Sequence, residues 1–466
     1  MNVNIEERYR AGVGKAYPVR QPSSSDDYLQ SVLRAERFIA QHAHHTAEGI
    51  YWDSYHATDS NNVDSSFYGG GAGIAYFYLK LYQVTHEQQY ADIVHQATRY
   101  VVAHWRETLA YANPILPQFA QGLYAGVGGI GLALADIYEY FHDETAEKGI
   151  REIVDYYRDT AKETSSGLEW TGSVALILDG GIILFLQRVQ ELFPEWPLRS
   201  LIVQAGAAYL DKGKPTANGG LIFDGFDGLT DYSAPNFEFG TAGAGYVLLK
   251  LYEFTQDDKY LHGAYAAAEY LKQLRYPQKK GYLIPYHLND DGTPVTDGNG
   301  NPIFYLSLCH GPSATAKFYF EFYKVTSETD NLEIIDNLFD GLESLGAPEY
   351  QSAGLWNCVT LCCGNAGLLH AFIGLYHATG NIRWKNLAQR TAATLLGWEE
   401  QLEGDASDWP IAWERIKPDD FSRRLGYFDG AAGIALSLLE IYLTEQGNYQ
   451  WDRLIVDPFP STAYGD

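Results

Sequence analysis

The chain has 466 residues, of which 46% are hydrophobic and 20% are charged. Its 33 Lys and Arg against 59 Asp and Glu give a formal net charge of −26 at pH 7. This length provides ample material for a large packed core. The acidic balance argues against a nucleic-acid-binding protein, because phosphate neutralisation needs clustered Lys and Arg. The same charge would attract a cationic partner such as a basic peptide.

The sequence also indicates the cellular compartment in which the protein is found. Its N-terminus, MNVNIEERYR, lacks the apolar core of a signal peptide, and no stretch approaches 18 uncharged apolar residues, so we expect no membrane span. The four cysteines all lie beyond residue 308, whereas a secreted disulfide framework would spread them along the chain. We expect a cytoplasmic protein with one domain over residues 1–466, in which residues 1–25 form a flexible N-terminal extension.

An internal repeat organises the chain. Seven segments rich in small residues each open an apolar run, and they begin at Gly69, Ala125, Asp179, Phe239, Cys309, Cys362 and Asp429. We take the closing small residue of each G-x-x-G-like unit as an anchor; the anchors are Gly73, Gly129, Ile183, Gly243, Ala314, Gly367 and Gly433. Nine residues after the anchor stand six Tyr and one Leu, namely Tyr82, Tyr138, Leu192, Tyr252, Tyr323, Tyr376 and Tyr442. The third copy is the weakest, because an Ile replaces the small anchor.

Each repeat predicts two helices. The run after the anchor is apolar nearly all round, which is typical of a helix buried on most sides. A short polar turn and a more amphipathic segment follow, for example YADIVHQATRYVVAHW from Tyr90, which indicates an outer helix. Seven such hairpins bury their inner faces by stacking side by side. We therefore predict an all-α fold, an (α/α)7 double toroid, with an open solenoid as the alternative and with structural roles for most of the glycines.

Three stretches interrupt the helical pattern. Residues 275–308 predict a β-hairpin with a long turn, residues 216–236 a loop or short hairpin, and residues 402–427 a long irregular loop. All three precede an inner helix. We therefore expect them to gather at one mouth of the toroid, where loops would grip a substrate.

The repeat register brings cysteines together. Cys309 and Cys362 each lie five residues before an anchor, in repeats five and six, and the next positions are His310 and Cys363. Equivalent positions of adjacent hairpins are neighbours in a closed toroid. Three thiols at helix N-termini are suited to a zinc site with one open position, which could activate a substrate thiol. Buried structural cysteines are the alternative, and Cys358 falls outside the equivalent set.

The same positions in the other repeats place titratable groups near this cluster. These are Asp179, Glu238, Asp429 and His310, which could act as general acid or base or could hydrogen-bond a metal ligand. An Asp before a helix is also an ordinary N-cap.

Together, the seven repeats, the CHG motif at Cys309–Gly311 and the CCG motif at Cys362–Gly364 resemble the lanthionine synthetase C-like (LanC-like) cyclases. The resemblance implies an (α/α)7 toroid with Zn2+ held by Cys309, Cys362 and Cys363. It implies the addition of a Cys thiol to dehydroalanine or dehydrobutyrine in a precursor peptide, which forms a lanthionine or methyllanthionine thioether ring. An enzyme acid then protonates the enolate at Cα.

Two positions depart from this pattern. Phe239 and Tyr305 stand where nisin-cyclase-like members have His and Arg. We therefore consider His310, Tyr305 and Asp179 as candidate catalytic residues for proton transfer.

The expected partners are a precursor peptide, consisting of a leader and a dehydrated core, and a separate dehydratase or kinase/lyase protein. Other readings are a zinc enzyme that joins glutathione or another thiol to dehydroamino acids, and a zinc-stabilised peptide-binding scaffold without activity. A toroid glycosidase is a more distant alternative, suggested by Trp356, Trp409, Trp413 and Asp429.

Overall fold

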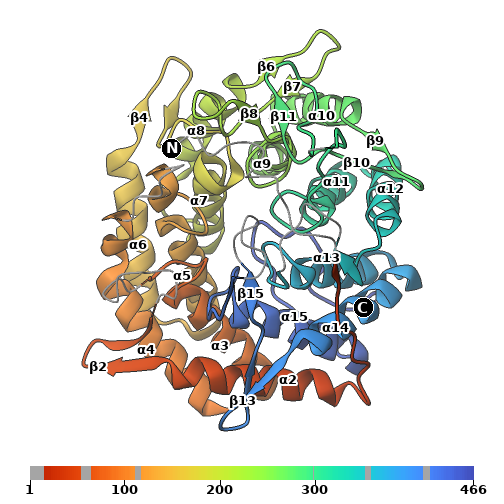
Figure 1. Ribbon diagram of the computed structural model, residues 1–466. Helices are drawn as coiled ribbons and strands as arrows, with labels where there is room; N and C mark the ends of the chain where they lie inside the picture. Colours follow the sequence, from red (N-terminus) through yellow and green to blue (C-terminus); the bar gives the residue numbers. More distant parts are fainter. Residues whose placement is uncertain are drawn as a thin grey trace.

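The computed structural model describes residues 15–53, 64–110, 117–297, 299–351, 358–412 and 420–465. Within these residues, seven inner helices surround a common centre (Figure 1). They are α3 (Gly71–Thr85), α5 (Val127–Phe141), α7 (Gly181–Leu192), α9 (Thr241–Thr255), α11 (Pro312–Thr326), α13 (Asn365–Thr379) and α15 (Ala431–Gln446). Each inner helix contacts the next, and α15 contacts α3, so the ring is closed. This confirms the predicted toroid over the open solenoid.

Seven outer helices surround the inner ring. They are α2 (Asp26–Gln41), α4 (Gln88–His104), α6 (Glu144–Thr160), α8 (Arg199–Asp211), α10 (Asp258–Gln273), α12 (Asp330–Ser344) and α14 (Ile382–Trp398). Six of them follow their inner partner in the chain, as predicted. The seventh pair differs, because α15 packs against the N-terminal helix α2. The two ends of the chain thereby close the ring together.

A closed circuit of main-chain hydrogen bonds joins the turns that lead into the inner helices. We call these residues the belt. The amide-to-carbonyl pairs are Tyr68–Tyr124, Leu123–Ile177, Ile177–Glu238, Glu238–Cys309, Cys309–Cys362, Cys362–Phe428 and Phe428–Tyr68, at 2.8–3.3 Å. Most belt residues lie five positions before an anchor. The exceptions are Leu123 in repeat two and Ile177 in repeat three, which lie six positions before it. In repeat three, a π-helical turn (Leu176–Gly180) precedes α7, where the sequence repeat is weakest.

The anchor glycines are needed because backbones approach closely at the belt. A Cβ atom on Gly433 would lie 1.7 Å from the Tyr427 carbonyl oxygen, and one on Gly367 would lie 2.2 Å from the Leu361 carbonyl oxygen. Such contacts are far inside van der Waals distance. The structural role expected for these glycines is therefore explained at both positions.

The strands form eight two-stranded antiparallel sheets within the described residues. Six are local hairpins, and β1–β12 and β8–β11 join segments far apart in the sequence. The bounds are β1 Lys15–Ala16, β2 Ala43–Thr46, β3 Gly49–Trp52, β4 Lys162–Glu163, β5 Leu168–Glu169, β6 Lys214–Pro215, β7 Leu221–Ile222, β8 Tyr232–Ser233, β9 Tyr276–Pro277, β10 Tyr282–Leu283, β11 Leu288–Asn289, β12 Tyr350–Gln351, β13 Glu400–Leu402, β14 Ala406–Asp408, β15 Ile411–Ala412 and β16 Phe421–Ser422. The three predicted interruptions thus contain short strands and lie between an outer helix and the next inner helix.

The N-terminal segment differs from the flexible extension that we expected over residues 1–25. Residues 1–14 lie outside the described part of the chain, but β1 pairs with β12. Tyr17 is buried, and its hydroxyl donates a 3.2 Å hydrogen bond to the Cys358 carbonyl oxygen. Residues 15–25 therefore pack on the toroid, because this segment carries an aromatic anchor and a strand pairing that its composition did not reveal.

The chain after α15 enters the centre of the ring. This C-terminal loop, residues 449–462, has its ends joined by a bridge between Gln450 and Thr462. The Tyr246 hydroxyl of α9 donates to the Ile455 carbonyl oxygen at 2.6 Å, and Lys80 of α3 donates to the Asp452 carbonyl oxygen at 3.1 Å. Both contacts lie on the inner helices below the belt.

Buried charges hold the loop in place. Arg453 of the loop pairs with Asp457 and with Glu440 of α15, each at 2.9 Å. His370 of α13 lies between the same two carboxylates, at 2.7 Å from Glu440 and 2.5 Å from Asp457. Burial lowers the pKa of His370, but the two carboxylates outweigh it and raise the pKa overall. A network in which every charge has a partner avoids the high cost of an isolated buried ion.

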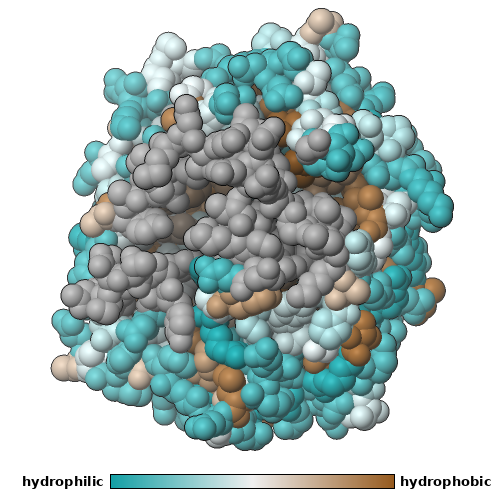
Figure 2. Space-filling view, in the orientation of Figure 1, coloured by the Kyte–Doolittle hydropathy of each residue, from teal (hydrophilic) through white to brown (hydrophobic). Residues whose placement is uncertain are grey.

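The described helices share one hydrophobic core. In the view of Figure 2, the rim of the ring is mainly hydrophilic, with scattered hydrophobic side chains. None of the helices in the described ranges combines the length and apolarity that crossing a membrane requires.

We expect Gly433→Ala to lower the free energy of unfolding by about 1–3 kcal/mol, because the added methyl group overpacks the belt. The measurement is denaturant unfolding. Ala314→Gly is the matched control, since Ala already occupies the equivalent anchor of repeat five, and it should cost about 1 kcal/mol through helix propensity. A Gly433→Ala protein as stable as wild type would contradict this account of the belt.

Candidate metal centre

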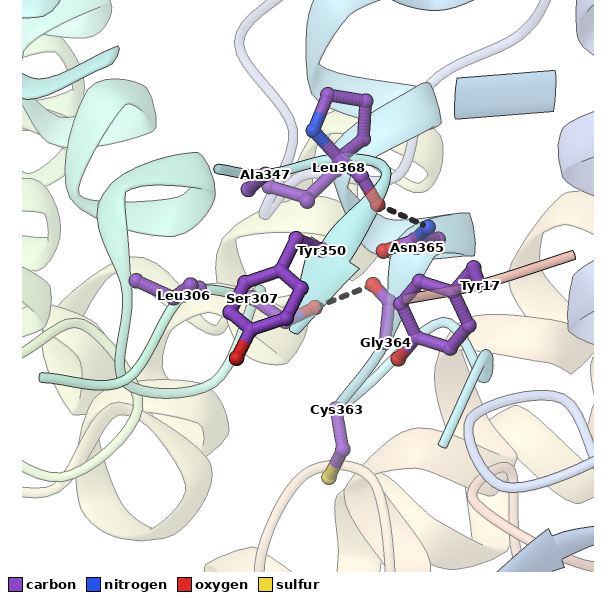
Figure 3. Close-up of a pocket in the computed structure, with 10 residues that line it drawn as sticks. Tyr17, Leu306, Ser307, Ala347, Tyr350, Cys363, Gly364, Asn365 and Leu368 are labelled. Carbon is purple, nitrogen blue, oxygen red and sulfur yellow. Dashed lines mark hydrogen bonds between the residues drawn. The ribbon is translucent and has the colours of Figure 1, made fainter. Parts of the chain in front are cut away.

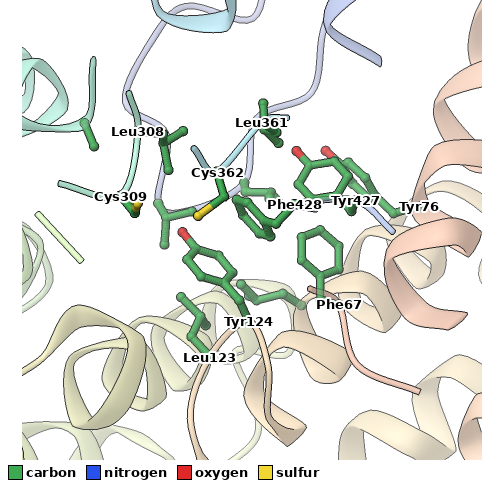
Figure 4. Close-up of a cluster of buried hydrophobic side chains, with 14 of the residues drawn as sticks. Phe67, Tyr76, Leu123, Tyr124, Leu308, Cys309, Leu361, Cys362, Tyr427 and Phe428 are labelled. Atoms are coloured by element: carbon green, nitrogen blue, oxygen red, sulfur yellow. The ribbon is translucent and has the colours of Figure 1, made fainter. Parts of the chain in front are cut away.

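Cys309, Cys362 and Cys363 form one buried cluster. The Cys309 amide donates to the Cys362 carbonyl oxygen at 3.2 Å as part of the belt, so adjacent repeats hold these residues side by side. The three sulfur atoms lie within 4.8 Å of one another. All three residues are buried and free of disulfide bonds. In Figure 4, the sulfur atoms of Cys309 and Cys362 lie above the ring of Tyr124.

The three thiols perturb one another electrostatically. Burial raises the pKa of Cys309, but hydrogen bonds from Cys362, Cys363 and the Tyr305 hydroxyl outweigh it and lower that pKa to about 5. The pKa of Cys362 is raised, mainly by its hydrogen bond to Cys309, and burial raises that of Cys363. One thiolate is thus favoured, and a second or third needs a nearby positive charge.

These residues fit a zinc ion. Zinc prefers thiolate ligands in tetrahedral geometry, with Zn–S distances of about 2.3 Å and hence sulfur–sulfur distances of about 3.8 Å. The observed sulfur–sulfur distances are all within 4.8 Å, so they would shorten by at most about 1 Å to reach that spacing. A divalent cation would also favour the thiolate forms of Cys362 and Cys363, whose pKa values are raised by the hydrogen bond to Cys309 and by burial, respectively. The three-ligand set leaves one tetrahedral position open.

Cys358 stands apart, as expected. It is fully buried, and its sulfur lies 2.9 Å from the Thr360 hydroxyl. Burial raises its pKa to about 12, so this thiol stays protonated.

Two tyrosines of the belt face the cysteines. A hydrogen bond links Tyr68 to Cys362, and burial raises the pKa of Tyr68 well above its usual range. The Tyr124 hydroxyl points toward the two sulfur atoms in Figure 4. Neither tyrosine was among the predicted site residues; the signal in the sequence is their position five residues before an anchor, which they share with Cys309 and Cys362.

Glu238 is the belt residue next to Cys309. Its side chain is buried at 3% exposure, and neither carboxylate oxygen has a hydrogen-bond partner in the described part of the chain. Burial and the charge of Cys362 raise the pKa of Glu238 well above its usual range, while Lys317 opposes this.

His310 and Tyr305 lie in an aromatic cluster beside the cysteines. The His310 ring stacks on Phe239, with centroids 4.8 Å apart and planes inclined by 6°. Phe226 in turn stacks on Phe239, with ring centroids 4.9 Å apart. We call the three rings of His310, Phe239 and Phe226 the aromatic column. Tyr305 meets the His310 ring edge-on at 5.3 Å and hydrogen-bonds to Cys309. The structure therefore brings these two predicted residues to the cluster.

Asp179 is engaged elsewhere. Its carboxylate accepts hydrogen bonds from the Thr171 amide and hydroxyl, both at 2.8 Å, and from the amides of Trp170 and Gly172. It thereby fixes the turn before α7, and it is not the N-cap of that helix. Burial raises its pKa, although these hydrogen bonds oppose the shift.

Asp429 and Arg424 form a buried pair in repeat seven. The Arg424 guanidinium lies 3.4 Å from the Asp429 carboxylate. Asp429 is four residues before its anchor, the position that Cys363 occupies in the adjacent repeat. Arg424 thus lies close enough to Cys363 for that thiol to act on the pKa of the guanidinium, which burial lowers.

The tryptophans that suggested a glycosidase do not support it. Trp409 is buried at 1% exposure, and its indole N–H donates to the Leu395 carbonyl oxygen at 2.8 Å, so it belongs to the core. Trp356 and Trp413 lie outside the described residues.

A small pocket lies behind the CCG turn (Figure 3). Tyr17, Tyr350 and Leu306 line it, and the Cys363 sulfur points away from them. In its wall the Ser307 hydroxyl donates to the Gly364 carbonyl oxygen at 2.6 Å. Asn365 also donates to the Pro348 carbonyl oxygen at 3.0 Å. These bonds fix the turn that carries Cys363.

Comparison with known proteins identifies the family. The sequence profile described as "Lanthionine synthetase C-like protein" matches residues 61–455, so the chain belongs to this family. No curated protein matches the chain.

A solved structure shares this fold. Nisin cyclase superposes with a TM-score of 0.58 at 14% identity, covering 90% of this chain and 94% of that one. A cellobiose 2-epimerase from Spirochaeta thermophila matches with a TM-score of 0.47 at 12% identity, covering 91% and 96% of the two chains. A family 76 glycoside hydrolase from a Bacteroides thetaiotaomicron strain also gives 0.47, at 13% identity, covering 91% and 79%. The last two likenesses have no bearing on function.

We expect Cys309→Ala, Cys362→Ala and Cys363→Ala each to lose bound zinc, because each removes one of three thiolate ligands. Cys358→Ala is the matched control and should keep the metal, since its thiol is protonated and hydrogen-bonded to Thr360. The measurement is metal content by plasma mass spectrometry on reduced, chelator-free protein. Zinc-free wild type, or equal metal in all four variants, would show that the cluster is structural.

Proposed function

We propose that this protein is a zinc-dependent peptide cyclase, which adds Cys thiolates of a precursor peptide to dehydroalanine or dehydrobutyrine residues. The observation that carries the proposal is the cluster of Cys309, Cys362 and Cys363, held by the belt in a chain of the LanC-like family. Zinc bound there would supply the positive charge that keeps an incoming thiol as a thiolate at neutral pH.

The residues around the cluster would create the environment for this reaction. The belt tyrosines and the aromatic column of Phe226, Phe239 and His310 form walls that exclude water from the reacting atoms. A dry site strengthens each electrostatic interaction within it. These walls also offer flat apolar surfaces to the planar, conjugated acceptor.

Proton transfer to Cα needs a group within reach of the acceptor. Of the three candidates, His310 and Tyr305 border the cysteines, whereas the carboxylate of Asp179 is saturated by hydrogen bonds to its own turn. We propose His310 as the acid, Tyr305 as the group that orients Cys309, and a mainly structural role for Asp179.

The proposed substrate is a leader-bearing peptide with a dehydrated core. A separate dehydratase or kinase/lyase protein would make the dehydroamino acids. The formal charge of −26 would favour a basic peptide segment. A cytoplasmic location stays a prediction.

Incubating the zinc-loaded protein with a dehydrated, Cys-containing peptide tests the activity. We expect peptide thiols to disappear without a mass change, because addition is an isomerisation, and to become resistant to alkylation. Cys309→Ala should be inactive. Reaction with glutathione alone would favour the general thiol-adding enzyme. Tight peptide binding without thiol loss would identify a scaffold.

His310→Gln should lower kcat by about 10²–10⁴, the usual contribution of a general acid or base, with zinc content unchanged. Asp179→Asn should mainly lower thermal stability, because an amide cannot accept all the hydrogen bonds of the carboxylate. The measurements are steady-state kinetics and thermal unfolding for both variants. A lowered kcat for Asp179→Asn together with an unchanged kcat for His310→Gln would assign the acid to Asp179.

A further inference from the structure

Two buried ionisable side chains lie close to the cysteines, one in the belt and one on an inner helix. Lys317 of α11 is 5% exposed, and Glu238 of the belt is 3% exposed. In the described part of the chain, both carboxylate oxygens of Glu238 are buried without a hydrogen-bond partner, and the Lys317 side chain makes no hydrogen bond or ion pair. The charge of Lys317 nevertheless acts on Glu238 and on Asp457 of the C-terminal loop. The Lys317 ammonium therefore lies within electrostatic range of both a belt residue and the C-terminal loop.

The repeat register explains this position. Lys317 lies three residues after its anchor, as do Tyr246 and His370 in the flanking repeats, and both of those side chains reach the C-terminal loop. Lys317 therefore faces the ring centre. Its Cα lies about 7.5 Å along the helix axis from Pro312. Because side chains of a helix lean toward its N-terminus, the ammonium points back up toward the belt and the cysteines.

An ammonium on a largely buried side chain without a protein partner is poorly solvated, so a group of opposite polarity at this place would bind it favourably. Arg424 also lies near the cysteines, but its guanidinium pairs with Asp429 at 3.4 Å. Of these two cations in the described part of the chain, Lys317 is thus the one available to an acceptor on the substrate. A dehydroamino acid carries such an acceptor, its carbonyl oxygen, which gains negative charge when a thiolate adds.

We propose that Lys317 is a catalytic residue that binds the carbonyl oxygen of the dehydroamino acid and stabilises the enolate formed there. This inference rests on the proposed cyclase function. The thiolate lone pair forms the new S–Cβ bond, the Cα=Cβ π pair shifts toward the carbonyl carbon, and the carbonyl π pair moves onto oxygen. Lys317 keeps its protons and donates a hydrogen bond to that oxygen. One proton then reaches Cα, which balances the proton lost by the thiol.

The test compares Lys317→Met with wild type on a dehydrated peptide. We expect kcat to fall about 10²–10³-fold, as when one donor to a developing oxyanion is removed. Zinc content and the Kd of a peptide with Ala in place of dehydroalanine should stay within about threefold, because the interaction strengthens in the transition state. Lys317→Arg should keep most of the activity, since it retains a cationic donor.

Lys80→Met is the matched control. Lys80 is another buried lysine of an inner helix, 1% exposed, but it donates to the C-terminal loop. This variant should lose stability and keep kcat. If Lys317→Met does not fold, Lys317→Gln against Lys317→Arg gives the same comparison of neutral and cationic side chains.

The outcomes separate the two proposals. An active wild type with a Lys317→Met kcat within about threefold would overturn the role of Lys317 and leave the cyclase proposal intact. A zinc-loaded wild type that adds no thiol to any dehydrated peptide would overturn both.

Discussion

The structure depends on the belt, a circuit of main-chain hydrogen bonds that runs once around the ring at 2.8–3.3 Å. A closed circuit fixes the relative height of every repeat, because no turn can slide along the ring axis without breaking two bonds. Helix packing alone would not impose this, since packed helices tolerate small shifts. The five glycine anchors follow from the belt: in those repeats the turn approaches the start of its helix so closely that a Cβ atom would collide with a carbonyl oxygen.

Because the height of every repeat is fixed, residues at equivalent positions of the repeats lie in the same layer of the ring. Residues five positions before the anchors share one layer, which holds Cys309, Cys362, Glu238 and the tyrosines. Residues three positions after the anchors form the next layer, with Tyr246, Lys317 and His370. The thiols therefore face polar and charged groups across a short distance inside a hydrophobic shell. Interactions between charges are strong there, because water is largely displaced.

Much of this arrangement was predictable from the sequence, because equivalent positions in a sequence repeat occupy equivalent places around the ring. The anchors predicted the inner helices, the closed ring and the meeting of Cys309 with Cys362 and Cys363. Contacts made by non-repeated segments were not predictable. The helix α2 completes the outer ring although no anchor precedes it. Buried Tyr17 attaches to the toroid a segment that we expected to be flexible. Likewise, periodicity places Lys317 within an apolar helix but does not show that it faces the cysteine layer.

The C-terminal loop has a consequence for how a long substrate could be handled. Its residues occupy the ring centre below the cysteines and are tied there by Arg453, Asp457 and the surrounding helices. The toroid is therefore a well rather than a tunnel, and a peptide cannot be threaded from one face to the other. A substrate with several thiols would have to withdraw and re-enter between additions. The order in which its rings close would then depend on which segment returns first.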